Sequence, residues 1–299
     1  NTASSDKVNF WQYAEALIGR ELAKDTGLTG HGLAGAMEPR PTGDWQVTGI
    51  PLTPQLDSGE IRPLQAAKIS VSAGDTLLAT TQIVAPVSWD VRCATCHTKP
   101  GITAEQDMLR QHDRLHQTEL AKSTPVNCTL CHAQAYVGAA GTDGVKSLSA
   151  ALHGAHASRV KADGDQSACY ACHPDGQGGS QRDVHRAQGI GCDGCHGSMS
   201  DLADAKRRPW VDEPSCGGCH TKPGFRFEQA GTLFRESRGH HGVQCATCHG
   251  SPHAVGPATT TEDNAQAVAL QGHAGPINTC AVCHTGRPEG RFDHRFGRG

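Results

Sequence analysis

Two different periodicities of apolar residues occur within the first ninety positions of the 299-residue chain. The first, in "NFWQYAEALIGRELAKDTG", repeats at the three- and four-residue spacing of a helix that buries one face. Glycine is favoured just after a helix because it adopts left-handed backbone angles without strain. We therefore expect a helix that begins near Phe10 and is capped at Gly27. Its apolar face is formed by Phe10, Ala14, Leu17, Ile18 and Leu22.

The second periodicity lies in "LQAAKISVSAGDTLLATTQIVAP", where two runs rich in β-branched residues flank the pair Gly74-Asp75. A glycine and an aspartate between such runs are typical of a short hairpin turn. The preceding "MEPRPTGDWQVTGIPLTPQ" is rich in proline and glycine and predicts a loop with room for one strand. Residues 1–90 are therefore expected to form a small α+β or β-rich N-terminal domain with a helix and a hairpin.

After residue 90 neither periodicity continues, and the composition indicates why. The chain is 36% hydrophobic and 4% aromatic, and it contains 36 glycines, 18 histidines and 14 cysteines. So little apolar surface offsets poorly the entropy that is lost when a chain becomes ordered. We therefore expect a bound group, rather than side chains alone, to fill the interior.

Charge and hydropathy argue against two classes of partner. The formal net charge is −3 with no long basic run, so a nucleic-acid partner held through its phosphates is not expected. No stretch approaches the roughly 20 consecutive apolar residues of a membrane-spanning helix, and no transmembrane segment is expected. The chain starts at Asn1 rather than Met, as processed exported proteins do, and export is expected.

All cysteines fall into C-x-x-C pairs, and a histidine directly follows every pair. The cysteines are Cys93, Cys96, Cys128, Cys131, Cys169, Cys172, Cys192, Cys195, Cys216, Cys219, Cys245, Cys248, Cys280 and Cys283. The histidines that follow are His97, His132, His173, His196, His220, His249 and His284. An even number of cysteines in an exported chain first suggests disulfides, but the regular spacing and the adjacent histidine favour another chemistry.

C-x-x-C-H is the attachment motif of c-type haem. Two thiols three positions apart reach the two vinyl groups of one porphyrin and form thioethers, and the adjacent histidine becomes the proximal ligand of the iron. Zinc sites would combine two C-x-x-C pairs and give no reason for the histidine. A redox-active C-x-x-C would occur once, beside a βαβ pattern. The motifs therefore predict seven haem c groups, each with its iron.

Eleven further histidines are candidates for the second, distal position on each iron. Methionine, the other common ligand, occurs only three times, so His/His coordination is expected, with about seven of the eleven as ligands. No histidine lies between His196 and Cys216, so the fifth haem is expected to take a remote ligand, such as His253 or His294, or one from another subunit. The candidates are His31, His112, His116, His153, His156, His185, His240, His241, His253, His273 and His294.

The fold class predicted for residues 91–299 is mostly irregular, with short α-helices wrapped around a chain of seven covalently bound haems. Successive motifs start 23 to 41 residues apart, which leaves room for short helices and loops only. The repeat is one of cofactor attachment rather than of a solenoid. Together with the haem-free domain at 1–90, two domains are predicted, and the macrocycles supply the apolar interior of the second.

The region from Cys93 to His284 resembles the multihaem c-type cytochromes of metal-reducing and other electroactive bacteria. The likeness lies in the motifs and in the segments "FRESRGHHGVQCATCHGSPHA" and "DNAQAVALQGHAGPINTCAVCH". The resemblance implies haems in near contact that form a continuous wire, and haem attachment outside the cytoplasm. Some extracellular proteins of this group form filaments, in which a histidine of the next subunit completes an iron.

These features predict a heptahaem electron carrier rather than an enzyme, because His/His ligation leaves no open iron position. Expected partners are redox proteins or an extracellular electron acceptor, together with a homopolymer through haem–haem or intersubunit histidine contacts. The expected location is extracellular or at the cell surface, with the periplasm as the alternative. The alternative function is a multihaem oxidoreductase that converts a small nitrogen or sulfur oxyanion at one open haem.

Overall fold

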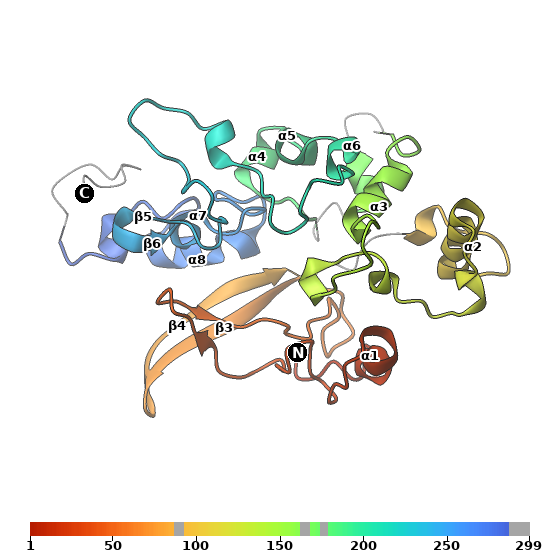
Figure 1. Cartoon of the computed structure of the whole chain (residues 1–299). Helices are drawn as coiled ribbons and strands as arrows, with labels where there is room; N and C mark the ends of the chain where they lie inside the picture. The colour runs from red at the N-terminus through yellow and green to blue at the C-terminus, as the bar shows by residue number, and fades with distance from the viewer. Residues whose placement is uncertain (87–92, 162–167, 174–178, 287–299) are drawn as a thin grey trace. The chain divides into compact units, whose positions relative to one another are not determined.

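A computed structural model describes residues 1–86, 93–161, 168–173 and 179–286 (Figure 1). Over these residues the chain divides into two compact units. The first unit comprises Asn1–Pro63, Val87–Leu148 and Ala171–Pro174. The second unit comprises Leu64–Pro86, Ser149–Tyr170 and Asp175–Gly299. The hairpin segment of the N-terminal region thus groups with residues that lie much later in the chain.

Short helices are the main regular structure of the described residues. Two of them, α5 and α7, coincide with C-x-x-C-H motifs (Figure 1). The α-helices are α1 (Phe10–Ile18), α2 (Ala104–His116), α3 (Leu148–His156), α4 (Val184–Ala187), α5 (Cys192–His196), α6 (Met199–Leu202), α7 (Cys245–His249) and α8 (Thr261–Gln271). Single 3-10 turns occupy Cys93–Thr95, Leu120–Lys122, Cys128–Leu130, Ala135–Val137, Ala168–Ala171, Cys216–Gly218, His240–Gly242 and Cys280–Val282.

The first predicted helix is present but ends earlier than expected. Helix α1 stops at Ile18, and Gly19 takes the left-handed cap position with φ 66°, its N–H donating to the carbonyl of Glu15. The predicted cap at Gly27 is therefore wrong. Gly27 instead lies against another loop, where a Cβ atom would come within 1.6 Å of the carbonyl oxygen of Gly49.

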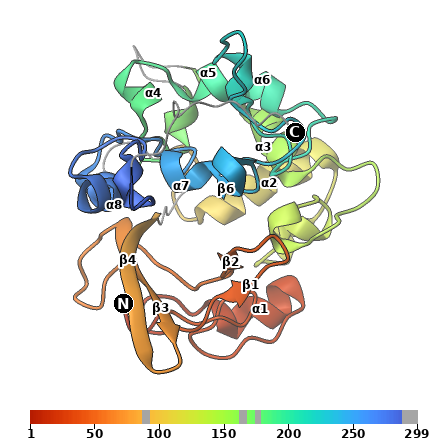
Figure 2. The ribbon, with the colours of Figure 1, turned by 90° about the vertical axis from the view of Figure 1, so that its left-hand side faces the viewer.

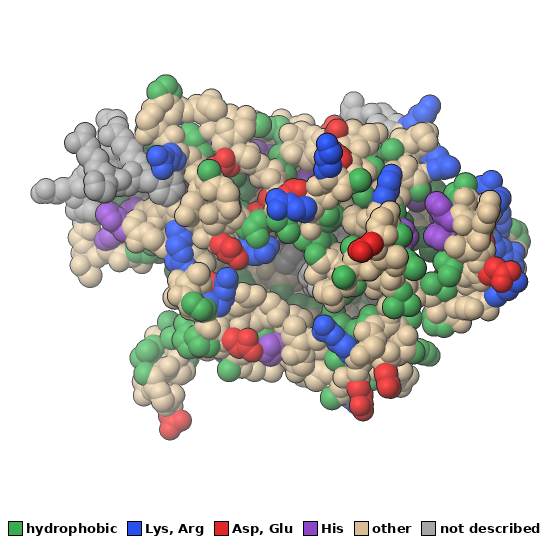
Figure 3. Space-filling model, viewed as in Figure 1, with side chains coloured by type: hydrophobic (Ala, Val, Ile, Leu, Met, Phe, Trp, Pro, Cys, Tyr) green, Lys and Arg blue, Asp and Glu red, His purple; other side chains and the backbone are tan. Residues whose placement is uncertain are grey.

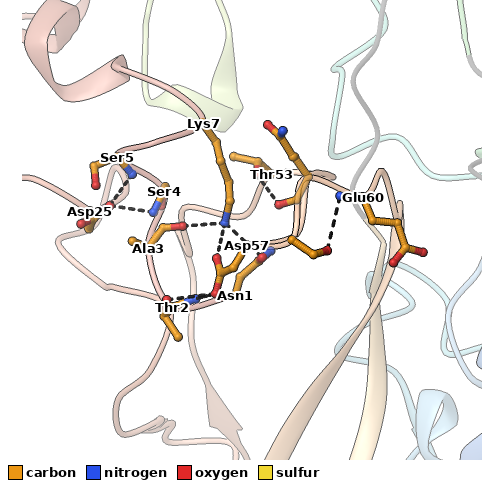
Figure 4. Close-up of polar contacts among 12 residues, drawn as sticks. Asn1, Thr2, Ala3, Ser4, Ser5, Lys7, Asp25, Thr53, Asp57 and Glu60 are labelled. Atoms are coloured by element: carbon orange, nitrogen blue, oxygen red, sulfur yellow. Dashed lines mark hydrogen bonds and ion pairs between the residues drawn. The ribbon is translucent and has the colours of Figure 1, made fainter.

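The N-terminal residues are fixed to a later loop by a polar network (Figure 4). Lys7, whose side chain is 3% exposed, donates from Nζ to Asp57 Oδ1 at 2.6 Å and to the carbonyl of Ala3 at 2.8 Å. The backbone N–H and the hydroxyl of Thr2 both donate to Asp57 Oδ2. Hydrogen bonds from Lys7 and then Thr2 lower the pKa of Asp57 to about 2, so its carboxylate stays charged.

The predicted hairpin is confirmed. Strands β3 (Leu64–Ala73) and β4 (Thr76–Pro86) are antiparallel, and Ala73 pairs with Thr76 across the turn Gly74-Asp75, where Gly74 has φ 57°. Helix α8 packs on β4, with a hydrogen bond from Gln266 Nε2 to Thr81 Oγ1 at 3.4 Å. The remaining ladders pair only two residues from each strand. Strand β1 (Glu38–Pro39) pairs with β2 (Trp45–Gln46), so the proline- and glycine-rich loop holds two short strands rather than one (Figure 2). Strand β5 (Arg238–Gly239) pairs with β6 (Val243–Gln244) (Figure 1).

The side-chain core of the described residues is small. The buried hydrophobic residues are Ala14, Leu64, Leu109, Ala150 and Ala254, two of which are leucines and three alanines. Large apolar side chains such as Leu130, 71% exposed, remain at the surface, and hydrophobic groups are visible across the face in Figure 3. Burial of so little apolar surface cannot by itself order a chain of this length.

In the part of the chain that the structure describes, no helix has both the length and the hydropathy that a membrane crossing requires.

Candidate haem-binding sites

Each C-x-x-C-H motif begins on a short helical turn. In the first, second, fifth and seventh motifs the backbone N–H of the histidine donates to the carbonyl of the first cysteine, at 2.9 to 3.0 Å. Residues three and four positions apart share one face of a helical turn. The two thiols and the imidazole of a motif therefore project from the same side, which is the arrangement that one porphyrin requires.

The thiols are neither in disulfides nor gathered into metal clusters. None of the fourteen cysteines is in a disulfide. Among the described residues, no three His, Cys, Asp or Glu side chains come together as ligands of one ion. The C-x-x-C pairs are thus not combined in the manner of a zinc site.

Thiols of consecutive motifs interact within the second unit. A hydrogen bond with Cys169 raises the pKa of the Cys192 thiol, and burial adds to this shift. Burial, and after it nearby negative charge, raises the pKa of three further thiols. The charges are those of Asp183 and then Cys219 for Cys195, of Glu228 and then Cys245 for Cys216, and of Cys283 for Cys248. In each case a thiol of the next motif is among the groups that affect the titration.

A large cavity of about 1760 Å³ lies among the last three motifs. Ordinary small-molecule pockets measure roughly 300–1000 Å³, so this space is wide enough for more than one macrocycle. The aromatic rings of Phe225 and Phe227, stacked at a centroid distance of 6.3 Å, form part of its wall. The motif and histidine side chains that line it are His220, Cys248, Cys280, Cys283, His284, His240 and His241. Thiols, imidazoles and flat apolar rings around one space fit a covalently attached porphyrin.

Four motif histidines each have the ring of a second histidine of the candidate set close by. In the first unit the ring centroids of His112 and His132 are 6.3 Å apart. The second unit contains three such pairs: His185 with His220 at 5.9 Å, His196 with His253 at 6.0 Å, and His240 with His284 at 6.0 Å. The histidine beside His220 is therefore His185, which lies 31 residues before the fifth motif, and His253 lies beside the fourth motif.

The Nδ1 atoms of several candidate histidines are held by protein acceptors. His132 donates to the carbonyl of Lys146, His153 to that of Ser149 and His156 to that of Leu152, each at 2.8 Å. A carbonyl oxygen can only accept, so the proton lies on Nδ1 and the lone pair on Nε2. Histidines that ligate metals generally donate their other N–H in this way.

Two histidines use a carboxylate instead. His97 Nδ1 lies 2.9 Å from Asp107 Oδ2, and His185 Nδ1 lies 2.8 Å from Asp183 Oδ2. Both carboxylates are almost fully buried, with side chains 7% and 5% exposed. A carboxylate partner makes an imidazole a stronger electron donor than a carbonyl partner does.

His112 is oriented through a relay. Its Nδ1 lies 3.0 Å from Thr118 Oγ1, and that hydroxyl donates its proton to Asp113 Oδ1 at 2.6 Å, so Nδ1 is the donor to Thr118. Partial burial, and then the nearby His116 and His132, lower the pKa of His112. A lower pKa favours the neutral imidazole, which is the form that binds a metal.

The other distal candidates are placed differently. His31 donates from Nδ1 to the carbonyl of Thr48, and its Nε2 lies 3.3 Å from Glu38 Oε1, so this contact must open before His31 could bind an iron. His116 lies beside His112 on α2 at 4.7 Å, and His273 Nδ1 lies 3.0 Å from the carbonyl of Ala274. His294 lies outside the described residues.

The backbone just before the sixth motif is strained. His240 and His241 have φ 34° and 57°, followed by Gly242 at 92°. Side chains other than glycine rarely take these angles, and such strain is concentrated at functional sites. Here the strained turn directs the His240 ring toward His284 and places His241 5.8 Å from His240.

Backbone pairing joins the segment before the fourth motif to the segment after the sixth. The N–H of Arg182 donates to the carbonyl of His253 at 2.7 Å, and that of Val184 to Val255 at 3.0 Å. The Arg182 guanidinium forms a two-point ion pair with Asp263, at 2.7 and 3.1 Å, with both side chains at most 5% exposed.

Sequence reasoning missed the groups that orient the histidines, namely Asp107, Asp183 and Thr118. Only Asp183 had a local signal, because an acidic residue two positions before His185 can fold back onto its ring. Asp107 is found only when α2 is placed next to the first motif.

A family described as "Cytochrome c554 and c-prime" matches residues 127–197 and 199–250. The match spans five of the seven motifs, from Cys128 to His249. No curated protein and no solved structure shows a significant match to the chain. The family match supports a c-type cytochrome that binds haem c and transfers electrons.

Proposed function

We propose that the chain is a heptahaem electron conduit, in which seven haem c groups with two histidine ligands each form a row. The observation that carries this proposal is the pairing of four motif histidines with a second histidine, at ring separations of 5.9 to 6.3 Å. Together with C-x-x-C-H motifs that start 23 to 41 residues apart, these pairs support a row of haems with two histidine ligands each.

When bound, each haem supplies an iron that gains and loses one electron. The chain's own residues anchor the porphyrins through thioethers, orient the imidazoles through Nδ1 and keep the macrocycles close together. The four pairs of a motif histidine with a second histidine support two protein ligands on an iron, which leaves no open position for a substrate.

Electrons are proposed to enter from a redox partner protein and to leave to an extracellular acceptor, with the protein at or beyond the cell surface. Assembly into a filament through haem contacts is part of this proposal. Electron microscopy of the native protein tests it, because filaments support the polymer and discrete particles contradict it.

The haem content is tested on mature holoprotein by intact mass and electron paramagnetic resonance. We expect the mass of seven haems and low-spin ferric signals only. A Cys93→Ser/Cys96→Ser variant serves as the matched control and should lose one haem. Unmodified motif cysteines in the wild-type protein would contradict the haem count. A high-spin haem that binds cyanide or nitrite would instead favour the oxidoreductase.

A further inference from the structure

We infer that the fourth and fifth irons each take a distal ligand that sequence proximity assigns elsewhere. His185, which precedes the fourth motif, serves the fifth iron opposite His220, and His253, which follows the sixth motif, serves the fourth iron opposite His196. The inference rests on the proposed function, because it requires haems with two histidine ligands, and it adds which residues hold which iron.

The separation of the rings carries the assignment. A metal–imidazole bond is about 2 Å long and the bound nitrogen lies about 1 Å from the ring centre, so two imidazoles across one iron have centroids about 6 Å apart. His185 and His220 are 5.9 Å apart, and His196 and His253 are 6.0 Å apart. The same spacing recurs at His112–His132 and His240–His284, and each pair joins one motif histidine to one other.

The surroundings of His185 fix it in this direction. Asp183 Oδ2 holds its Nδ1, while Asp183 Oδ1 accepts from the N–H of Arg186 at 3.0 Å and from Gln181 Nε2 at 3.2 Å. Asp183 is 3% exposed, so this carboxylate has little freedom to turn. With Nδ1 held, Nε2 is the nitrogen that remains for an iron.

His253 is fixed by its backbone. Its carbonyl accepts from Arg182, and the Val184–Val255 bond continues this pairing, which brings residue 253 to the segment that leads into the fourth motif. Assigning His185 to the fourth iron would leave two histidines, His185 and His253, for a single distal position. The crossed assignment gives each ring one iron.

Pairs of substitutions test this by counting high-spin haems in the mature holoprotein. Loss of both ligands of one iron affects one haem, whereas loss of one ligand from each of two irons affects two. We therefore expect His185→Ala/His220→Ala and His253→Ala/His196→Ala to show the same number of high-spin haems as each single variant. The crossed combinations His185→Ala/His196→Ala and His253→Ala/His220→Ala are the matched controls and should show one more.

The reverse pattern, with His185→Ala/His196→Ala equal to its single variants, would overturn the inference while leaving the haem row intact. If a variant lacking a motif histidine does not mature, density for His185 and His253 in a cryo-electron microscopy map of wild-type holoprotein decides the same question. Absence of attached haem in that protein would overturn the proposed function, which is a different result from a different pairing of ligands.

Discussion

Asp107 accepts a hydrogen bond from the histidine of the first motif: its Oδ2 lies 2.9 Å from His97 Nδ1. Lys99 Nζ lies 3.0 Å from the other oxygen. The hydrogen bond from His97, and then that from Lys99, lower the pKa of Asp107, so the group is a carboxylate at neutral pH. A negative partner strengthens the imidazole as a donor and stabilises the ferric state of an iron bound to it.

The substitution Asp107→Asn should therefore raise the reduction potential of the first haem. A tenfold change in relative affinity for the two oxidation states corresponds to about 59 mV for one electron, so we expect a shift of tens of millivolts. A spectroelectrochemical titration measures it. Asp201→Asn removes the same charge from a capping box in α6, in the second unit, and should leave the potential of the first haem unchanged. A shift of equal size in both variants would contradict the role of Asp107.

The ion pair between Arg182 and Asp263 gives a prediction for stability. Asp263→Asn leaves the buried guanidinium without its charge partner, and breaking such a pair usually costs about 3–5 kcal/mol. We expect a clear fall in the denaturation midpoint of the holoprotein at unchanged haem content. Glu262→Gln, at the adjacent exposed position of α8, is the matched control and should change the midpoint little. Equal effects would show that the pair is not stabilising.

The sequence predicts the local chemistry of this protein well and its long-range pairings poorly. The motif Cys192–His196 is a single helical turn, and the turn Gly74-Asp75 depends only on the two strands that flank it. Both can therefore be predicted from short stretches of sequence. Both Gly19 and Gly27 are suitable helix caps by sequence, and only the contact of Gly27 with another loop decides between them. His185 lies seven residues before Cys192, yet its ring lies beside that of His220, and Asp183 holds its Nδ1.

The close approach at Gly27 should make this position intolerant of a side chain. A Cβ atom there meets backbone rather than a flexible side chain, and overpacking of this kind costs about 1–3 kcal/mol. Gly27→Ala should therefore lower the melting temperature of the holoprotein. Gly35→Ala, in the same region, places its methyl group in open space and serves as the control. An unchanged melting temperature for Gly27→Ala would show that the loops can separate at no cost.

The network around Asp57 predicts a dependence on pH. The pKa of Asp57 is about 2 in the folded protein against an ordinary 3.8, so the folded state binds fewer protons at this group between these values. Its contribution to stability is complete above about pH 4 and is lost as the pH falls toward 2. Asp57→Asn should lower the melting temperature at neutral pH, and the difference from wild type should shrink over this acidic range. Asp6→Asn is the control, and a difference that stays constant with pH would refute the assignment.

The backbone pairing of residues 182–184 with 253–255 has a consequence for how such a protein can change in length. A chain of independent modules could gain or lose one motif together with its linker without disturbing the other modules. Here the segment that leads into the fourth motif is hydrogen-bonded to the segment that follows the sixth, so a deletion among the motifs between them would disturb this pairing. Residues 182–255 therefore form an interleaved block, and the array can be lengthened or shortened only outside that block or by replacing it whole.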